Sequence, residues 1–143
     1  MTRIDFYISK NNNDDARARL ACRVAEKAYQ MKHSVYVHVD DRQQAEQFDQ
    51  LLWMFRDRSF VPHCLSDDPH CAEASVIIGY GDAPAGNPEV LINISNEVPG
   101  FFSRYERVAE IVGGDENFRQ KARERFKFYR ERGYPLETHE LSS

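Results

Sequence analysis

Short apolar runs alternate along the chain with stretches that repeat apolar residues at helical spacing, and this alternation limits the fold more than any other feature. The runs are rich in β-branched and aromatic residues, as buried strands are, and they are residues 3–9, 34–40, 74–81 and 89–95. We expect helices from 14 to about 32, after Asp41, from 99 to about 112 and from 116 to 132. Strands that alternate with helices predict a layered α/β fold with a mostly parallel sheet.

The expected helix boundaries rest on capping and stop signals. Asn13 or Asp14 is a suitable N-cap for the first helix and Asp41 for the second, and Pro99 is suited to the first turn of a helix. The glycine pair at 113–114 would end that helix, Asp115 would cap the next one, and Gly133 would end it.

The size and composition of the chain are those of one ordinary soluble domain. Its 143 residues, 41% of them hydrophobic, predict a single domain over 1–143 with a frayed tail at 135–143. No apolar run is long enough to cross a bilayer, and the N-terminus has no signal-peptide pattern, so we expect a cytoplasmic protein without membrane contact. There Cys22, Cys64 and Cys71 are expected as thiols.

The chain offers little that indicates catalysis or a cofactor. The turn after the first strand, SKNNNDD, has no glycine where a phosphate would approach the backbone, and no P-loop or GxSxG motif is present. The group His63, Cys64, His70 and Cys71 has ligand types that zinc takes, but its spacing matches no finger or ribbon. We therefore expect no catalytic residue, no cofactor and no metal.

Positive charge is concentrated near the C-terminus. The net charge of −4 argues against a general nucleic-acid coating protein, yet residues 119–132 hold seven basic and two acidic residues. On a helix, Phe118, Ala122, Phe126 and Tyr129 share one face. A basic stripe lies beside it, made of Arg119, Arg123, Lys127 and Arg130. A third group, predicted to face solvent, is Lys121, Arg125 and Arg132.

A basic stripe of this density predicts an anionic partner, because like charges packed together destabilise a helix. The partner is either a phosphate backbone or an acidic peptide with a hydrophobic end, and the pattern alone leaves both open. The acidic remainder of the chain favours the peptide.

Several sequence blocks resemble the chi subunit family of bacterial DNA polymerase III holoenzyme, a clamp-loader accessory. These blocks are FYIS at 6–9, LW at 52–53, SFVPH at 59–63, LINIS at 91–95 and KARERFKFYRERGY at 121–134. SFVPH and ARER are the most specific of them. The resemblance runs nearly end to end and implies a Rossmann-like three-layer fold without catalytic activity.

The resemblance also implies two partners. One is the acidic C-terminal tail of single-stranded DNA-binding protein, which ends in Pro-Phe. Arg123 would grip the terminal carboxylate, Val112 and Phe126 would line the phenylalanine pocket, and Arg119 and Lys127, with Arg130, would attract the aspartates. Phe126 stands where the family often has Tyr, and Gly113–Gly114 replaces a Val-Pro-type continuation.

The second implied partner is the psi subunit, which would dock around Phe60, Val61 and Pro62 and link the chain to the clamp loader. A repair helicase would share that surface, and DNA would be contacted only indirectly. The alternative function is direct binding of single-stranded nucleic acid by the basic helix.

Overall fold

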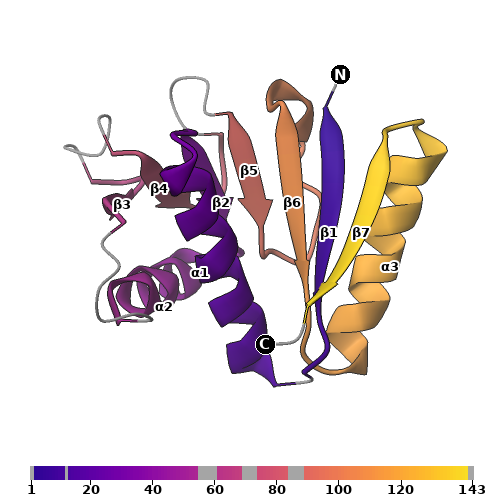
Figure 1. Cartoon of the computed structure of the whole chain (residues 1–143), viewed down its shortest axis with the longest axis horizontal. Coiled ribbons are helices and arrows are strands. Elements are labelled where there is room, and N and C mark those ends of the chain that lie inside the picture. The colour runs from indigo at the N-terminus through magenta and orange to yellow at the C-terminus, as the bar shows by residue number, and fades with distance from the viewer. Residues whose placement is uncertain (1, 12, 55–60, 69–73, 84–88, 142–143) are drawn as a thin grey trace.

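A computed structural model describes residues 2–11, 13–54, 61–68, 74–83 and 89–141 of the chain (Figure 1). In these residues seven strands form one sheet. They are β1 (Arg3–Ser9), β2 (Val35–His38), β3 (His63–Leu65), β4 (Val76–Gly79), β5 (Val90–Asn93), β6 (Arg107–Val112) and β7 (Leu136–Leu141). The helices are α1 (Asp14–Gln30), α2 (Arg42–Met54), a 3-10 turn η2 (Phe102–Arg104) and α3 (Glu116–Glu131).

The sheet is parallel throughout the described pairings. Its strand order is β3-β4-β2-β5-β6-β1-β7, so β2 lies between β4 and β5, and β1 lies between β6 and β7. Parallel strands place their carboxyl ends along one edge of the sheet. The predicted α/β class is confirmed, and the sheet is more uniformly parallel than the sequence predicted.

Side-chain oxygens cap the first two helices as the sequence predicts. Asn13 is the N-cap of α1, and its side chain accepts a hydrogen bond from the Asp15 amide at 3.0 Å. The carboxylate of Asp41 accepts from the Gln44 amide at 2.9 Å, and the Gln44 side chain accepts in return from the Asp40 amide. This arrangement resembles a capping box, except that Gln44 accepts from the amide of Asp40 and not from that of the N-cap residue Asp41.

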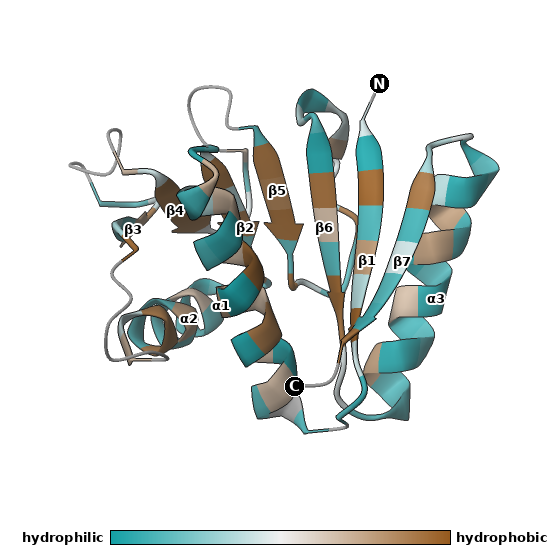
Figure 2. Cartoon of the chain, in the orientation of Figure 1, coloured by the Kyte–Doolittle hydropathy of each residue, from teal (hydrophilic) through white to brown (hydrophobic). Residues whose placement is uncertain are grey.

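Two apolar clusters pack on opposite faces of the sheet. Alternate strand residues such as Val35 and Val37 face α1 and α2, whereas Tyr36 faces the other side with Ile4 and Phe6. Figure 1 shows α1 and α2 together, with α3 apart from them beside β7. In Figure 2 β4 and β5 are coloured as hydrophobic, whereas much of the visible side of α3 is hydrophilic.

The helix predicted from 99 to about 112 is wrong. Only the three residues of η2 are helical, and β6 occupies Arg107–Val112, hydrogen-bonded in register to both β1 and β5. The segment RVAEIV alternates in its side-chain directions: Val108 and Val112 face α3, and Ala109 and Ile111 face α1. A strand in the middle of the sheet therefore replaces the expected helix.

The frayed tail predicted at 135–143 is wrong for residues 136–141. These residues form β7, which pairs in parallel with β1 from Ile4↔Leu136 to Ser9↔Leu141. Most of the β7 side chains are exposed or half-buried, which is why the segment reads as polar and irregular. Backbone pairing with a buried strand, rather than burial of its own side chains, holds β7 in place.

We predict that Gly79→Ala destabilises the fold. A Cβ at Gly79 would lie 2.6 Å from the hydroxyl oxygen of Tyr36 and 2.8 Å from its ring, and Tyr36 is fully buried. Overpacking of this kind costs about 1–3 kcal/mol. Urea unfolding measures the loss. Gly100→Ala is the control, because nothing lies within 4 Å of a Cβ there; equal stability of the two variants would contradict the prediction.

Candidate functional site

The last helix begins and ends where the sequence predicts. Asp115 is the N-cap of α3, and its carboxylate accepts a hydrogen bond from the Phe118 amide at 3.1 Å. Gly133 follows the helix with a positive φ of 78°, a conformation that glycine adopts without a steric penalty. Both ends of the basic run are therefore defined by local chemistry.

The rotation of α3 differs from the one predicted. Its buried residues are Ala122, Arg125 and Tyr129, so Arg125 faces the sheet and not the solvent. The guanidinium Nε of Arg125 donates to Glu110 of β6 at 2.9 Å, in an ion pair with side-chain exposures of 5% and 0%. The predicted placement of Arg125 on the solvent face is wrong, because a buried acid on β6 draws its side chain inward.

Glu110 accepts hydrogen bonds from three side chains on two elements, α3 and β5. Besides Arg125, the hydroxyl of Tyr129 donates to it at 2.7 Å, and the side-chain amide of Asn93 on β5 donates at 3.0 Å. Burial, together with the Glu110 charge, raises the pKa of Tyr129, so its hydroxyl stays a donor. A buried carboxylate needs such partners, and this network joins α3 to the centre of the sheet.

The predicted basic stripe lies on the outer side of α3. Arg123, Lys127 and Arg130 are exposed, and Arg119 is half-buried. Arg119 donates to the carbonyl oxygens of Ser9 at 2.9 Å and Gly114 at 3.3 Å. The structure thus brings these four side chains onto one surface, which we call the α3 basic stripe.

Two cations of the α3 basic stripe have acidic partners within the chain. Arg123 donates to Glu116 at 2.7 Å, and this hydrogen bond lowers the pKa of the Glu116 carboxyl. Lys127 lies 3.9 Å from Glu131. All four side chains are more than half exposed, and exposed pairs of this kind contribute little to the free energy of folding. A stronger anionic ligand can therefore displace them.

The predicted apolar side of the site is only partly open. Val112 is 6% exposed and lies in the core next to α3. The ring of Phe126 is half-buried, 5.2 Å edge-on from Phe6, and the Arg130 guanidinium lies 6.0 Å from its centroid. Phe126 is therefore partly exposed next to the α3 basic stripe, and Val112 belongs to the buried cluster against which Phe126 packs.

The other predicted interface lies at the opposite end of the sheet, next to β3. Phe60 falls outside the described residues, Val61 is 2% exposed within the core, and Pro62 is half-buried. Trp53 and Met54, at the end of α2, have exposed fractions of 47% and 70%. The Trp53 ring lies 4.5 Å from the ring of His63. Exposed apolar surface is thus present near this segment, although the Val61 side chain does not contribute to it.

The loop considered for zinc does not present free ligands in its described part. Cys64 is disulfide-bonded, so the prediction of a thiol there is wrong, whereas Cys22 is a free buried thiol whose pKa burial raises to about 12. The His63 side chain is fully buried and bonded through both ring nitrogens to backbone oxygens of Val61 and Asp49. His70 and Cys71 lie outside the described residues.

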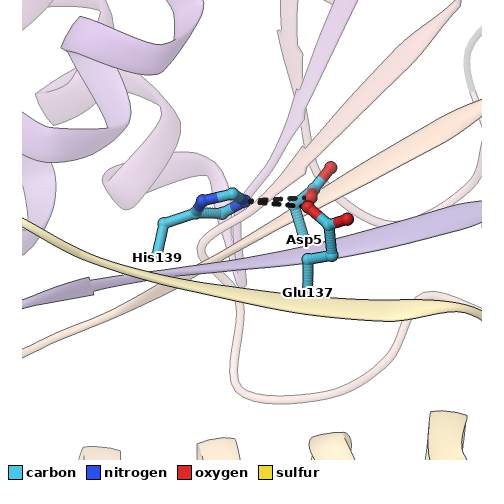
Figure 3. Close-up of side chains that lie close together, drawn as sticks. All are labelled: Asp5, Glu137 and His139. Carbon is cyan, nitrogen blue, oxygen red and sulfur yellow. Dashed lines mark hydrogen bonds and ion pairs between the residues drawn. The ribbon is translucent and has the colours of Figure 1, made fainter.

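A second group of metal-ligand types, which the sequence did not reveal, joins β1 to β7. Asp5, Glu137 and His139 bring their ligand atoms within 4.8 Å of one another, and His139 lies 3.1 Å from Asp5 (Figure 3). The guanidinium groups of Arg3 and Arg107 both lie 3.4 Å from the Asp5 carboxylate. These two cations already compensate the carboxylates, so the group acts as an ion-pair cluster between the strands.

No helix in the described parts of the chain is long and apolar enough to cross a membrane.

Comparisons with known proteins agree on one family. Residues 1–137 match the family described as DNA polymerase III chi subunit, HolC. The chain is 45% identical over 141 residues to the DNA polymerase III subunit chi of Pseudomonas aeruginosa, covering 99% of this chain and 98% of that protein. It is 28% identical to the chi subunit of Escherichia coli, with 96% and 97% covered.

Among solved structures, the crystal structure of T4 UvsW is similar with a TM-score of 0.63 and 8% sequence identity. The match covers 99% of this chain and 42% of that one. At this identity the likeness concerns the fold alone.

We predict that Arg125→Met lowers the free energy of unfolding by about 3–5 kcal/mol, because it leaves Glu110 charged and buried without its cation. Arg123→Met is the control; it removes an exposed ion pair and should change the free energy of unfolding far less than Arg125→Met does. Adding Glu110→Gln to Arg125→Met should recover part of the loss. Urea unfolding of the variants measures this, and equal stability of the two single variants would be incompatible with the proposed network.

Proposed function

The chain belongs to the DNA polymerase III chi subunit family, non-catalytic accessory subunits of the replicase, and we propose that it acts there as an adaptor between two proteins. One partner is the acidic C-terminal tail of single-stranded DNA-binding protein. The other is the psi subunit, which links the chain to the clamp loader. The observation that carries the proposal is the outward-facing α3 basic stripe with the half-buried ring of Phe126 beside it.

The α3 basic stripe fits the chemistry of an acidic peptide with a hydrophobic end. Arg123 and Lys127 reach solvent, and their partners Glu116 and Glu131 are themselves exposed. A terminal carboxylate would replace Glu116 on Arg123, with a fork of donors available to both oxygens. Arg119, Lys127 and Arg130 would attract the remaining carboxylates, and the terminal phenylalanine would pack against Phe126 with Val112 beneath it.

Direct binding of single-stranded nucleic acid is less well supported than peptide binding. Such binding uses aromatic rings on which bases stack. The aromatic rings of α3 are engaged with the protein: Tyr129 is buried, and Phe118, Phe126 and Phe128 are half-buried. The Phe128 ring lies 5.9 Å from that of Phe102, and the Arg132 guanidinium covers it at 3.6 Å from the centroid. The helix thus provides cations but few stacking surfaces.

Arg123→Ala should weaken binding of a fluorescent acidic peptide ending in Pro-Phe by roughly tenfold or more, because a charged hydrogen bond contributes about 1.5–3 kcal/mol. Arg132→Ala is the matched control, since that guanidinium lies over Phe128 away from the α3 basic stripe. Fluorescence anisotropy at low and high salt measures both. Equal affinity of wild type and Arg123→Ala would remove the site, and tight binding of a bare oligonucleotide would favour the nucleic-acid alternative.

The psi subunit is proposed to dock at the β3 end of the sheet. The segment Phe60–Pro62 would contribute there through Phe60 and Pro62, because the Val61 side chain is in the core. Trp53 and Met54 add exposed apolar surface close by, and Trp is enriched among the residues that dominate interface energies. A repair helicase would compete for this same surface.

If this surface binds psi, Trp53→Ala should reduce the amount of psi that co-purifies with the chain, while Met31→Ala should not. Met31 is the control because it is also apolar and exposed, at 56%, but it lies at the end of α1. Quantitative co-purification of co-expressed subunits gives the comparison. Unchanged psi recovery with folded Trp53→Ala would place the interface elsewhere.

A further inference from the structure

A crevice opens at the carboxyl ends of three central strands. It has a volume of about 850 Å³ and lies between the ends of β2, β4 and β5 and the segment that leads through η2. After β2 the chain continues through α2 to β3, which lies on the β4 side of β2. After β5 it continues to β6, on the opposite side, so the connections from these two neighbouring strands run in opposite directions. In open parallel sheets this edge is where ligands bind, at the point where the strand order changes direction. The volume lies in the range of ligand-binding pockets.

One buried polar side chain reaches this crevice without a complete set of partners. His38, at the end of β2, is only 9% exposed, and its ring lies edge-on to Phe101 at 5.4 Å. Its Nδ1 lies 3.3 Å from the hydroxyl of Tyr36. The other nitrogen, Nε2, has no hydrogen-bond partner in the described residues, and it is not among the fully enclosed unpaired atoms there. Because His38 lines the crevice, Nε2 is the ring nitrogen available to a ligand there.

The partner of Nδ1 determines which nitrogen carries the proton. Burial raises the pKa of Tyr36, so its hydroxyl keeps its hydrogen, and Nδ1 of His38 is the acceptor that the described residues provide for it. Burial also lowers the pKa of His38, although the Asp40 charge opposes this, so the ring is neutral near pH 7. A neutral ring that accepts at Nδ1 carries its hydrogen at Nε2. His38 thus directs one N–H donor into the crevice.

The rim of the crevice is acidic. Asp40, Asp82 and Glu97 contribute three carboxylates, against the single guanidinium of Arg104. Asp40 is held in place by hydrogen bonds from the backbone and side-chain nitrogens of Asn96, at 3.0 and 3.2 Å. With His38 neutral, the lining favours a positively charged group at the rim and a hydrogen-bond acceptor at the base.

We propose that this crevice binds a lysine or arginine residue, whose carbonyl oxygen accepts from Nε2 of His38 while its cationic group meets the rim carboxylates of Asp40, Asp82 and Glu97. A basic residue offers both groups within one side-chain length. The residue is either a free amino acid or part of a peptide, and the chemistry of recognition is the same. This site is separate from the α3 basic stripe and has the opposite charge.

The test titrates the full chain, labelled with ¹⁵N, with N-acetyl-lysine methylamide and N-acetyl-arginine methylamide. Three further compounds serve as comparisons. Free lysine tests whether the ligand is a free amino acid. Butylamine keeps the cationic group but lacks the carbonyl oxygen, and N-acetyl-norleucine methylamide keeps the carbonyl oxygen but lacks the charge. We expect the blocked lysine or arginine to shift the His38 Nε2 resonance and to bind at least about tenfold more tightly than butylamine, since one lost hydrogen bond costs about that factor. The norleucine compound should bind least. Free lysine that binds as well as the blocked form would assign the site to an amino acid, and weaker binding would assign it to a peptide.

Variants make the assignment specific. His38→Phe should abolish the preference for the carbonyl-bearing probe, and Asp82→Asn should weaken both cationic probes. His33→Gln is the control, because His33 pairs with Glu89 at the other end of β2. Binding of the acidic peptide at α3 should be unchanged in all three variants. A failure of the crevice proposal can therefore be distinguished from a failure of the proposed function. No shift of His38 with either blocked probe, or equal binding to wild type and Asp82→Asn, would overturn the proposal.

Discussion

The buried ion pair between Glu110 and Arg125 determines how the last helix meets the sheet. A buried pair of this kind adds little net stability, because desolvation offsets much of the attraction, but leaving either partner alone is costly. The ion pair and the Tyr129 hydrogen bond therefore favour one rotation of α3 about its axis over other rotations. In that rotation the α3 basic stripe faces solvent. The proposed peptide site thus depends on a contact that no ligand touches.

The sheet separates the surfaces on which the proposals rest. The α3 basic stripe lies at the β1–β7 side of the sheet, and the apolar surface around Trp53 lies at the β3 side. Between them, the carboxyl ends of the central strands form the acidic crevice at His38. An adaptor must hold two partners at once without one blocking the other. In the proposed adaptor, the parallel sheet of the described residues would keep the two binding surfaces apart.

The sequence predicts well those elements whose signals are local. The strand at 3–9, the cap of α1 at Asn13 and the ends of α3 follow from side-chain alternation and from capping residues. It misses β6, because Pro99 and the glycine pair suggest a helix, and it misses β7, whose polar side chains give no burial signal. Arg125 is misplaced because helical angles identify a face but not a buried acid on another strand. A clue was present in Glu110, the one charged residue within the apolar segment VAEIV.

The claim that α3 receives an acidic chain end is tested most directly by mapping the contact on the chain itself. Backbone amide resonances of the ¹⁵N-labelled chain would be followed while an unlabelled acidic peptide ending in Pro-Phe is added. We predict that the largest shifts occur along α3 between residues 116 and 131 and at Val112, and that β3 and the His38 crevice are unaffected. Shifts centred on any other surface, with α3 unchanged, would contradict the account.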